Sequence, residues 1–237
     1  MAASETEAHK ELKRLSMRWA REQGYSCCGA EISLPHSGYR ADVAAYKPAY
    51  EQRTVEFEGK NLRQRHPVIG TTAVFECKQS RADLLNDSCL SGKTREKLKR
   101  LNERRETLER LLKVHLPSAA NGDSLFQEFQ TYNLTAQNHK GYQKVLRDIA
   151  ALQTGLFHKT KFENLVRYRC ANLFYLVTVD DIIAGYELPL NWGLLVKKDE
   201  SLELHRKPVW IEVHEGARLA VLQRLAMAGS RNPPSGK

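Results

Sequence analysis

The sequence lacks any apolar run near the roughly 20 residues that a membrane-spanning helix needs. Its first residues also lack the basic start and apolar core of a secretory signal. Cysteine is scarce, with five residues and no Cys/His spacing of the zinc type. We therefore expect reduced thiols, no membrane association, and a cytoplasmic (nucleoid-associated) location, or a nuclear one in a eukaryote.

Two common catalytic motifs are missing as well. The chain has no Gly-x-Ser-x-Gly elbow, which argues against a serine hydrolase of that type. It has no Gly-x-x-x-x-Gly-Lys-Ser/Thr loop, so the chain itself is not expected to hydrolyse ATP.

The composition is that of a globular protein with a basic surface. The 237 residues are 41% hydrophobic and 27% charged, with a net charge of +9. This length suits one large domain or two small ones, and we favour one domain over residues 1–229. The basic balance favours an anionic partner, nucleic acid before an anionic membrane.

A charged pair stands out in a stretch that otherwise reads as a buried strand. Residues 71–75 are apolar or β-branched, which favours a strand. Glu76 and Lys78 follow two residues apart, so they point to one face of that strand. Buried charges are costly unless something compensates them, which makes this pair a candidate site.

Two further acids lie on a predicted hairpin upstream. Residues 30–34 and 39–46 read as strands around a turn. A turn centred on His36 and Ser37 places Glu31 directly opposite Asp42, although another turn length would shift this register. Like charges directly opposite are destabilising. A cation between them would remove the conflict, so the three acids and one lysine predict a metal site.

The connection over residues 47–70 is rich in basic side chains. Part of it extends strand two or adds a small hairpin. Its basic residues either grip phosphates or belong to a solvated loop, and the sequence leaves both open. The candidates for phosphate contact are Arg53, Lys60, Arg63 and Arg65.

Periodicity and turn signals predict the rest of the chain. Ser80 is a predicted N-cap with Asp83 at its capping-box position. Residues 91–160 read as a helical insertion between core strands three and four, and residues 230–237 as a disordered tail. The predicted helices are 5–23, 92–115, about 125–149, 161–171 and 211–228, and the further strands are 172–179, 193–197 and 202–205.

The helix predicted over residues 92–115 has an apolar stripe and many charges. The stripe contains Leu98, Leu101, Leu108 and either Leu111 or Leu112. The helix either packs simply with a solvated basic face, or faces DNA, or docks a protein partner or a second copy of the chain.

The ordered motifs resemble the PD-(D/E)XK nuclease superfamily, and within it the MmcB-like DNA-repair group. The likeness covers about residues 5–90 and 160–210. It implies an α/β, restriction-endonuclease-like mixed sheet flanked by helices. The matching pieces are Ala30-Glu31-Ile32-Ser33-Leu34, Gly38-Tyr39-Arg40-Ala41-Asp42-Val43, Phe75-Glu76-Cys77-Lys78-Gln79-Ser80-Arg81-Ala82-Asp83-Leu84, Leu173-Phe174-Tyr175-Leu176-Val177 and Leu188-Pro189-Leu190-Asn191-Trp192-Gly193-Leu194-Leu195.

The resemblance also implies roles for residues. Asp42 and Glu76 would be metal ligands, Lys78 the catalytic lysine and Glu31 an accessory acid that either completes the metal shell or helps to hold a second ion. Gln79 follows the lysine as in a subset of the superfamily. Carboxylates favour Mg²⁺ or Mn²⁺ over zinc, and the backbone carbonyl of Cys77 is a further candidate ligand.

The expected function is therefore a metal-dependent endonuclease that hydrolyses DNA phosphodiester bonds in repair, recombination or processing. DNA is favoured over RNA, and the number of metal ions, one or two, is left open. Arg40 and Arg81 join the basic residues expected to contact nucleic acid. The alternative is a non-catalytic nucleic-acid-binding or scaffold protein on the same fold.

Overall fold

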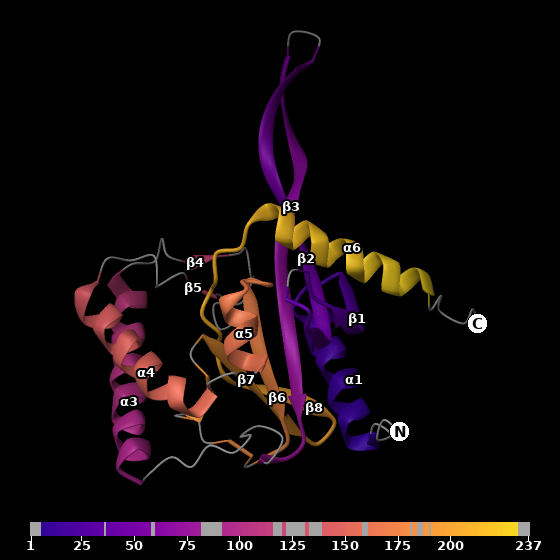
Figure 1. Ribbon diagram of the computed structural model, residues 1–237. Coiled ribbons are helices and arrows are strands. Elements are labelled where there is room, and N and C mark those ends of the chain that lie inside the picture. The colour runs from indigo at the N-terminus through magenta and orange to yellow at the C-terminus, as the bar shows by residue number, and fades with distance from the viewer. Residues whose placement is uncertain are drawn as a thin grey trace.

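The computed structural model shows a mixed α/β protein built on a six-stranded mixed sheet (Figure 1). It describes residues 6–35, 37–57, 60–81, 92–115, 120–121, 131–132, 139–157, 161–180, 182–183, 187–189 and 191–231. Within these ranges the helices are α1 (Glu7–Glu22), α3 (Gly92–His115), α4 (Lys140–Phe157), α5 (Lys161–Arg167) and α6 (Glu215–Arg231). The strands are β1 (Cys27–Ser33), β2 (Arg40–Phe57), β3 (Lys60–Lys78), β4 (Ala120–Asn121), β5 (Thr131–Tyr132), β6 (Leu173–Thr178), β7 (Trp192–Lys198) and β8 (Ser201–Arg206).

The strand order of the large sheet is β1-β2-β3-β6-β7-β8. The first three strands are antiparallel neighbours, β3–β6 and β6–β7 are parallel, and β7–β8 is antiparallel. The predicted insertion therefore lies between two strands that are neighbours in the sheet. Two strands that pair in parallel need a long crossover, and the insertion lies within that connection.

Helices cover both faces of the sheet. The apolar stripe of α1 packs on one face, with Leu12, Leu15 and Trp19 buried against Phe75 and its neighbours. On the other face α5 and α6 bury Phe162, Leu165, Val221 and Leu225. The central strand β6 is therefore buried on both sides, as its continuous apolar run requires.

The predicted hairpin register is confirmed. Ala30 pairs with Val43 and Ile32 with Ala41, so the register on both sides places Glu31 opposite Asp42. Glu31 itself departs from the extended conformation with φ of 56°. A non-glycine residue in this region is strained, and such strain persists only where the surroundings hold it.

The connection over residues 47–70 is a long two-stranded ribbon rather than an irregular loop. β2 continues to Phe57, and β3 starts at Lys60. The ribbon extends beyond the ends of the neighbouring strands and projects away from the rest of the protein at the top of Figure 1. The prediction that part of this connection extends strand two or adds a hairpin is confirmed. The full length of the ribbon was not predicted, because the described side chains of residues 50–55 and 61–67 are exposed on both faces and no apolar alternation marks the strands.

The base of the ribbon is held firmly. Gly70 is buried at a register shift between Lys47 and Ala49. Its N–H donates to the Tyr46 hydroxyl at 3.0 Å. From α6, Arg218 donates to the carbonyls of Ile69 and Gly70 at 2.7 and 3.0 Å.

Gly70→Ala is expected to lower the free energy of unfolding by about 3 kcal/mol. A Cβ at this position would stand 1.9 Å from the backbone oxygen of Lys47, so the backbone would have to move. Chemical denaturation measures the change. Gly229→Ala is the matched control, since its Cβ meets nothing within 4 Å and a helical glycine gains from the change. Equal stability of the two variants would contradict the tight approach at Gly70.

The insertion contains a helix pair and a short two-stranded sheet. The helix predicted over 92–115 is confirmed as α3. Its stripe is covered by α4, with Leu98 packed on Val145 and Ile149, and Leu112 on Tyr142. Leu112 is buried and Leu111 is 50% exposed, which settles the alternative between them. The apolar stripe is therefore used inside the protein and is not open to a partner.

The helix predicted from about residue 125 is wrong in its bounds. Residues 131–132 form β5, paired with β4, and α4 starts at Lys140. His139 explains the start, because its Nδ1 accepts a hydrogen bond from Tyr142 N at 3.0 Å and so caps the helix. The insertion is bound to the sheet by Arg206 of β8, which donates to Asn102 Oδ1 at 3.1 Å.

Other boundaries differ by a few residues. α5 ends at Arg167 rather than 171, and Arg169 follows with φ of 49°. α6 starts at Glu215 and runs past the predicted stop at Gly229 to Arg231. The predicted cap at Asp83 and residues 232–237 of the predicted tail lie outside the described residues. Within the described part of the chain, no helix is long and apolar enough to cross a membrane.

Candidate active site

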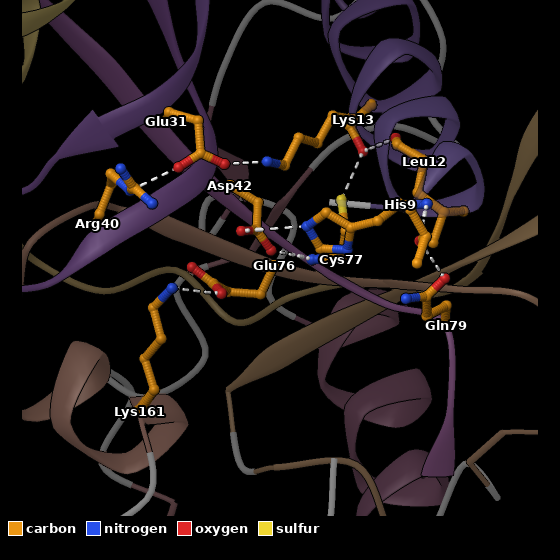
Figure 2. A network of polar contacts seen from close by, with 12 residues as sticks. His9, Leu12, Lys13, Glu31, Arg40, Asp42, Glu76, Cys77, Gln79 and Lys161 are labelled. Carbon is orange, nitrogen blue, oxygen red and sulfur yellow. Dashed lines mark hydrogen bonds and ion pairs between the residues drawn. The ribbon is translucent and has the colours of Figure 1, made fainter. Parts of the chain in front are cut away.

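Two carboxylates lie close together where β2 begins and β3 ends. Val43 pairs with Phe75, so Asp42 and Glu76 occupy the next step of this antiparallel ladder. The first turn of α1 lies on one side of them, and the start of α5 on the other (Figure 2). The predicted juxtaposition of Asp42 and Glu76 is therefore present in the structure.

Glu76 is the most deeply buried acid of the site, with 1% of its surface exposed. Its Oε2 pairs with Lys161 Nζ at 2.7 Å, and its Oε1 is buried without a hydrogen-bond partner. Burial, followed by the negative charge of Asp42, raises the pKa of Glu76 to about 7. Lys161 and Lys78 oppose this rise because their positive charges favour the ionised carboxylate.

Asp42 is oriented by two groups. Its Oδ2 accepts a hydrogen bond from Cys77 N at 2.7 Å. Its Oδ1 lies 3.6 Å from His9 Nε2 on α1. These contacts hold the carboxylate at the end of β3, beside Glu76.

Lys78 lies on the same face of β3 as Glu76, as the spacing predicts. Its ammonium stands 6.0 Å from the centroid of the Phe162 ring on α5. Glu76 meets Lys161 of the same helix, so both side chains face α5. The ammonium of Lys78 can therefore contact an anion that approaches the two carboxylates.

Glu31 is engaged differently from the prediction. Its carboxylate forms ion pairs with Lys13 and Arg40 (Figure 2). The conflict with Asp42 is thus relieved by two protein cations rather than requiring a metal ion. The structure does not bring Glu31 to Glu76, and its predicted role as an accessory metal ligand gains no support.

Three other predicted residues also have protein partners. Gln79 Oε1 accepts from the hydroxyl of Thr6 at 2.7 Å, which fastens the start of α1 to the end of β3. Arg81 pairs with buried Glu187 at 2.7 Å and donates to the Ile182 carbonyl. These contacts hold secondary-structure ends together, and any catalytic or phosphate-binding role for Gln79, Arg81 or Arg40 stays a prediction.

The basic residues of the ribbon are not part of this site. Arg53, Lys60, Arg63 and Arg65 lie on the projecting part of β2 and β3. Arg65 is eleven residues from Glu76 along β3, which corresponds to about 36 Å. They therefore cannot touch a group bound between Asp42 and Glu76.

Sequence reasoning missed three residues of the site: Lys161, His9 and Lys13. Lys161 is brought to Glu76 only by the chain crossover, so no local pattern marks it. For His9 and Lys13 the sequence does contain a weak indication. His9 lies four residues before Lys13, and Lys13 three residues before Ser16, so both fall on the buried face of α1, where polar residues are unusual.

The residues present fit a hard divalent cation. Among the described residues, no group of three or more His, Cys, Asp or Glu side chains is arranged around one point. Mg²⁺, however, is usually held by one or two carboxylates, with waters and substrate phosphates completing its shell. A buried, unpartnered carboxylate oxygen on Glu76 beside Asp42 suits that arrangement.

Comparison with known proteins adds little. No family model and no curated protein matches the chain. Among solved structures, it is similar to the SPO1766 protein of unknown function from Silicibacter pomeroyi, with 15% sequence identity over 99% of this chain and 97% of that chain, and a TM-score of 0.47. A likeness this distant carries no information on activity.

The raised pKa of Glu76 predicts a pH-dependent stability. Between 4.5, its ordinary value, and about 7, folded Glu76 holds a proton that the unfolded chain has released. The free energy of unfolding therefore falls as pH rises through this window, by about 3 kcal/mol.

Glu76→Gln should remove this loss. We expect the variant to gain stability relative to wild type as pH rises from 4.5 to 7. Denaturant unfolding across this range measures the difference, with exposed Glu51→Gln as the control that should run parallel to wild type. If the free energy of unfolding depended on pH in the same way for wild type, Glu76→Gln and Glu51→Gln, Glu76 would not be buried as described.

Proposed function

We propose that this protein is a metal-dependent nuclease that hydrolyses DNA phosphodiester bonds on a restriction-endonuclease-like core. The observation that carries the proposal is the buried Glu76 carboxylate, with one oxygen unpartnered, beside Asp42 at the end of β3. A buried carboxylate oxygen without a hydrogen-bond partner is rare in proteins and, in a cluster with a second acid, is typical of a site that binds a cation.

The element order supports the same proposal. A helix is followed by a strand with Glu31, a strand with Asp42, a strand with Glu76 and Lys78, and after the insertion by β6. This is the order that the superfamily resemblance implies, with the helix expected after Ser80 lying outside the described residues. The pairing of β6 with β3 keeps the core contiguous across the insertion.

Each site residue has a role that follows from its contacts. A bound Mg²⁺ or Mn²⁺ would supply an activated water and offset the phosphate charge. Asp42 and Glu76 would hold it, and the Cys77 amide keeps Asp42 in place. Lys161 favours the ionised form of Glu76. Lys78 would neutralise the scissile phosphate or orient the attacking water.

A second candidate is a nucleic-acid-binding or scaffold protein without catalysis. One observation favours it: Glu31, the third acid, is bound by Lys13 and Arg40 and does not join the other two. A site reduced to two carboxylates binds a metal more weakly in the absence of substrate.

Cleavage assays separate the two candidates. We would incubate linear duplex, nicked, flapped, four-way and single-stranded DNA with the protein in Mg²⁺, Mn²⁺ or EDTA. Cutting that requires the metal and is abolished by both Asp42→Ala and Lys78→Ala would support the nuclease. Binding without cutting under every condition would support the non-catalytic candidate instead.

A further inference from the structure

The projecting ribbon is exposed along its length. We define the β2–β3 arm as residues 49–57 and 60–68. Every described side chain from residues 50–55 and 61–67 is exposed, including Tyr50 at 53% and Leu62 at 43%. An exposed two-stranded ribbon adds little to stability by itself. The firm base at Gly70 and Arg218 nevertheless fixes the direction in which it projects.

The two faces of the arm differ in the arrangement of their arginines. On one face Arg63 lies opposite Thr54 and Arg65 opposite Gln52. The Arg65 guanidinium stacks 4.7 Å above the centroid of the Tyr50 ring. In the strand register, the next pair of this face toward the turn is Glu56 and Asn61.

By register, the opposite face carries Glu51, Arg53 and Lys60 together with Val55 and Leu62, and it has no two neighbouring arginines. Arg53 pairs with Glu51 at 3.3 Å, and Val55 lies opposite Leu62. The face with Arg63 and Arg65 is therefore the one suited to a polyanion. Its Gln, Thr and Arg side chains can also donate hydrogen bonds to base edges.

We infer that the arm enters the major groove of duplex DNA with its Arg63 and Arg65 face against the nucleic acid. A groove about 12 Å wide admits a two-stranded β-ribbon. Arginine binds phosphate or guanine with two parallel hydrogen bonds, and the net charge of +9 favours approach to a polyanion. The deep, narrow major groove of double-stranded RNA does not admit such a ribbon, so the arm selects duplex DNA.

This inference goes beyond the proposed nuclease and does not depend on it. The arm is too far from Glu76 to reach the reacting atoms, so its contacts add affinity and selection of the duplex. The test is therefore a binding measurement in EDTA, where cleavage does not occur. A wrong inference about the arm would therefore appear in the binding measurement, and a wrong proposal of nuclease activity in the cleavage assay.

The experiment is fluorescence anisotropy with labelled duplex DNA, double-stranded RNA and single-stranded DNA at several salt concentrations. Wild type is compared with Arg63→Ala, Arg65→Ala and the double variant. Arg53→Ala, on the opposite face, is the control with the same change of charge. All these side chains are exposed, so the variants should keep the wild-type thermal unfolding curve.

For duplex DNA, the double variant should bind about 10- to 100-fold more weakly, and the slope of log K against log salt should shrink by about 2. Arg53→Ala should change affinity by less than about 3-fold. An effect of Arg53→Ala equal to that of Arg63→Ala would overturn the assignment of the face. Equal affinity of wild type for double-stranded RNA would overturn groove entry, and so would absence of duplex binding.

Discussion

Replacing Glu76 by glutamine should reduce metal-dependent DNA cleavage at least about 10³-fold while raising stability at pH 8. The amide is nearly isosteric but carries no negative charge to hold a divalent cation. The same change removes the charge that is buried at 1% exposure beside Asp42. A loss of activity with a gain of stability is the signature of a buried catalytic charge, because damage to the fold lowers both.

The measurement pairs initial cleavage rates with unfolding free energies for the same preparations. Asp42→Asn should lose activity to a similar degree. Glu187→Gln is the matched control: Glu187 is also a buried carboxylate paired with a cation, Arg81, but it lies outside the site. Its cleavage rate should stay near wild type. Full activity of Glu76→Gln would falsify the assignment of Glu76 as a metal ligand.

Lys161→Met should destabilise the metal-free protein by about 3 kcal/mol at pH 8 and much less at pH 5.5. At pH 8 Glu76 is ionised, and loss of Lys161 leaves its buried charge near Asp42 without its ion-pair partner. At pH 5.5, below the raised pKa of Glu76 of about 7, the carboxyl is protonated and needs no partner. The cost of the substitution should therefore rise with pH.

Denaturant unfolding at both pH values, with and without Mn²⁺, tests this. At pH 8, Mn²⁺ should recover part of the stability of the variant by binding the two carboxylates, Asp42 and Glu76. The control is Lys198→Met, which breaks the exposed pair with Glu203 and should leave the free energy of unfolding nearly unchanged at either pH. In a double-mutant cycle, Glu76→Gln should cancel most of the effect of Lys161→Met. An equal loss at both pH values would mean that Lys161 acts through packing and not through the charge of Glu76.

The sequence by itself determined the local elements and the two central acids. The apolar run before Glu76 predicted the end of β3, the helical stripe of Leu12, Leu15 and Trp19 predicted α1, and the turn at residues 35–38 predicted the register beside Asp42. These succeed because strand alternation, helical periodicity and turn chemistry act over a few neighbouring residues.

Only the tertiary structure decided which groups surround those acids. Lys161 reaches Glu76 across the insertion, Lys13 and Arg40 engage Glu31, and the arm projects as a ribbon. Charge–charge contacts leave no periodic trace in the chain, because they depend on where distant elements pack. For the arm, the sequence predicted only an extension of strand two or a small hairpin, because a ribbon exposed on both faces needs no apolar alternation that would mark its full length.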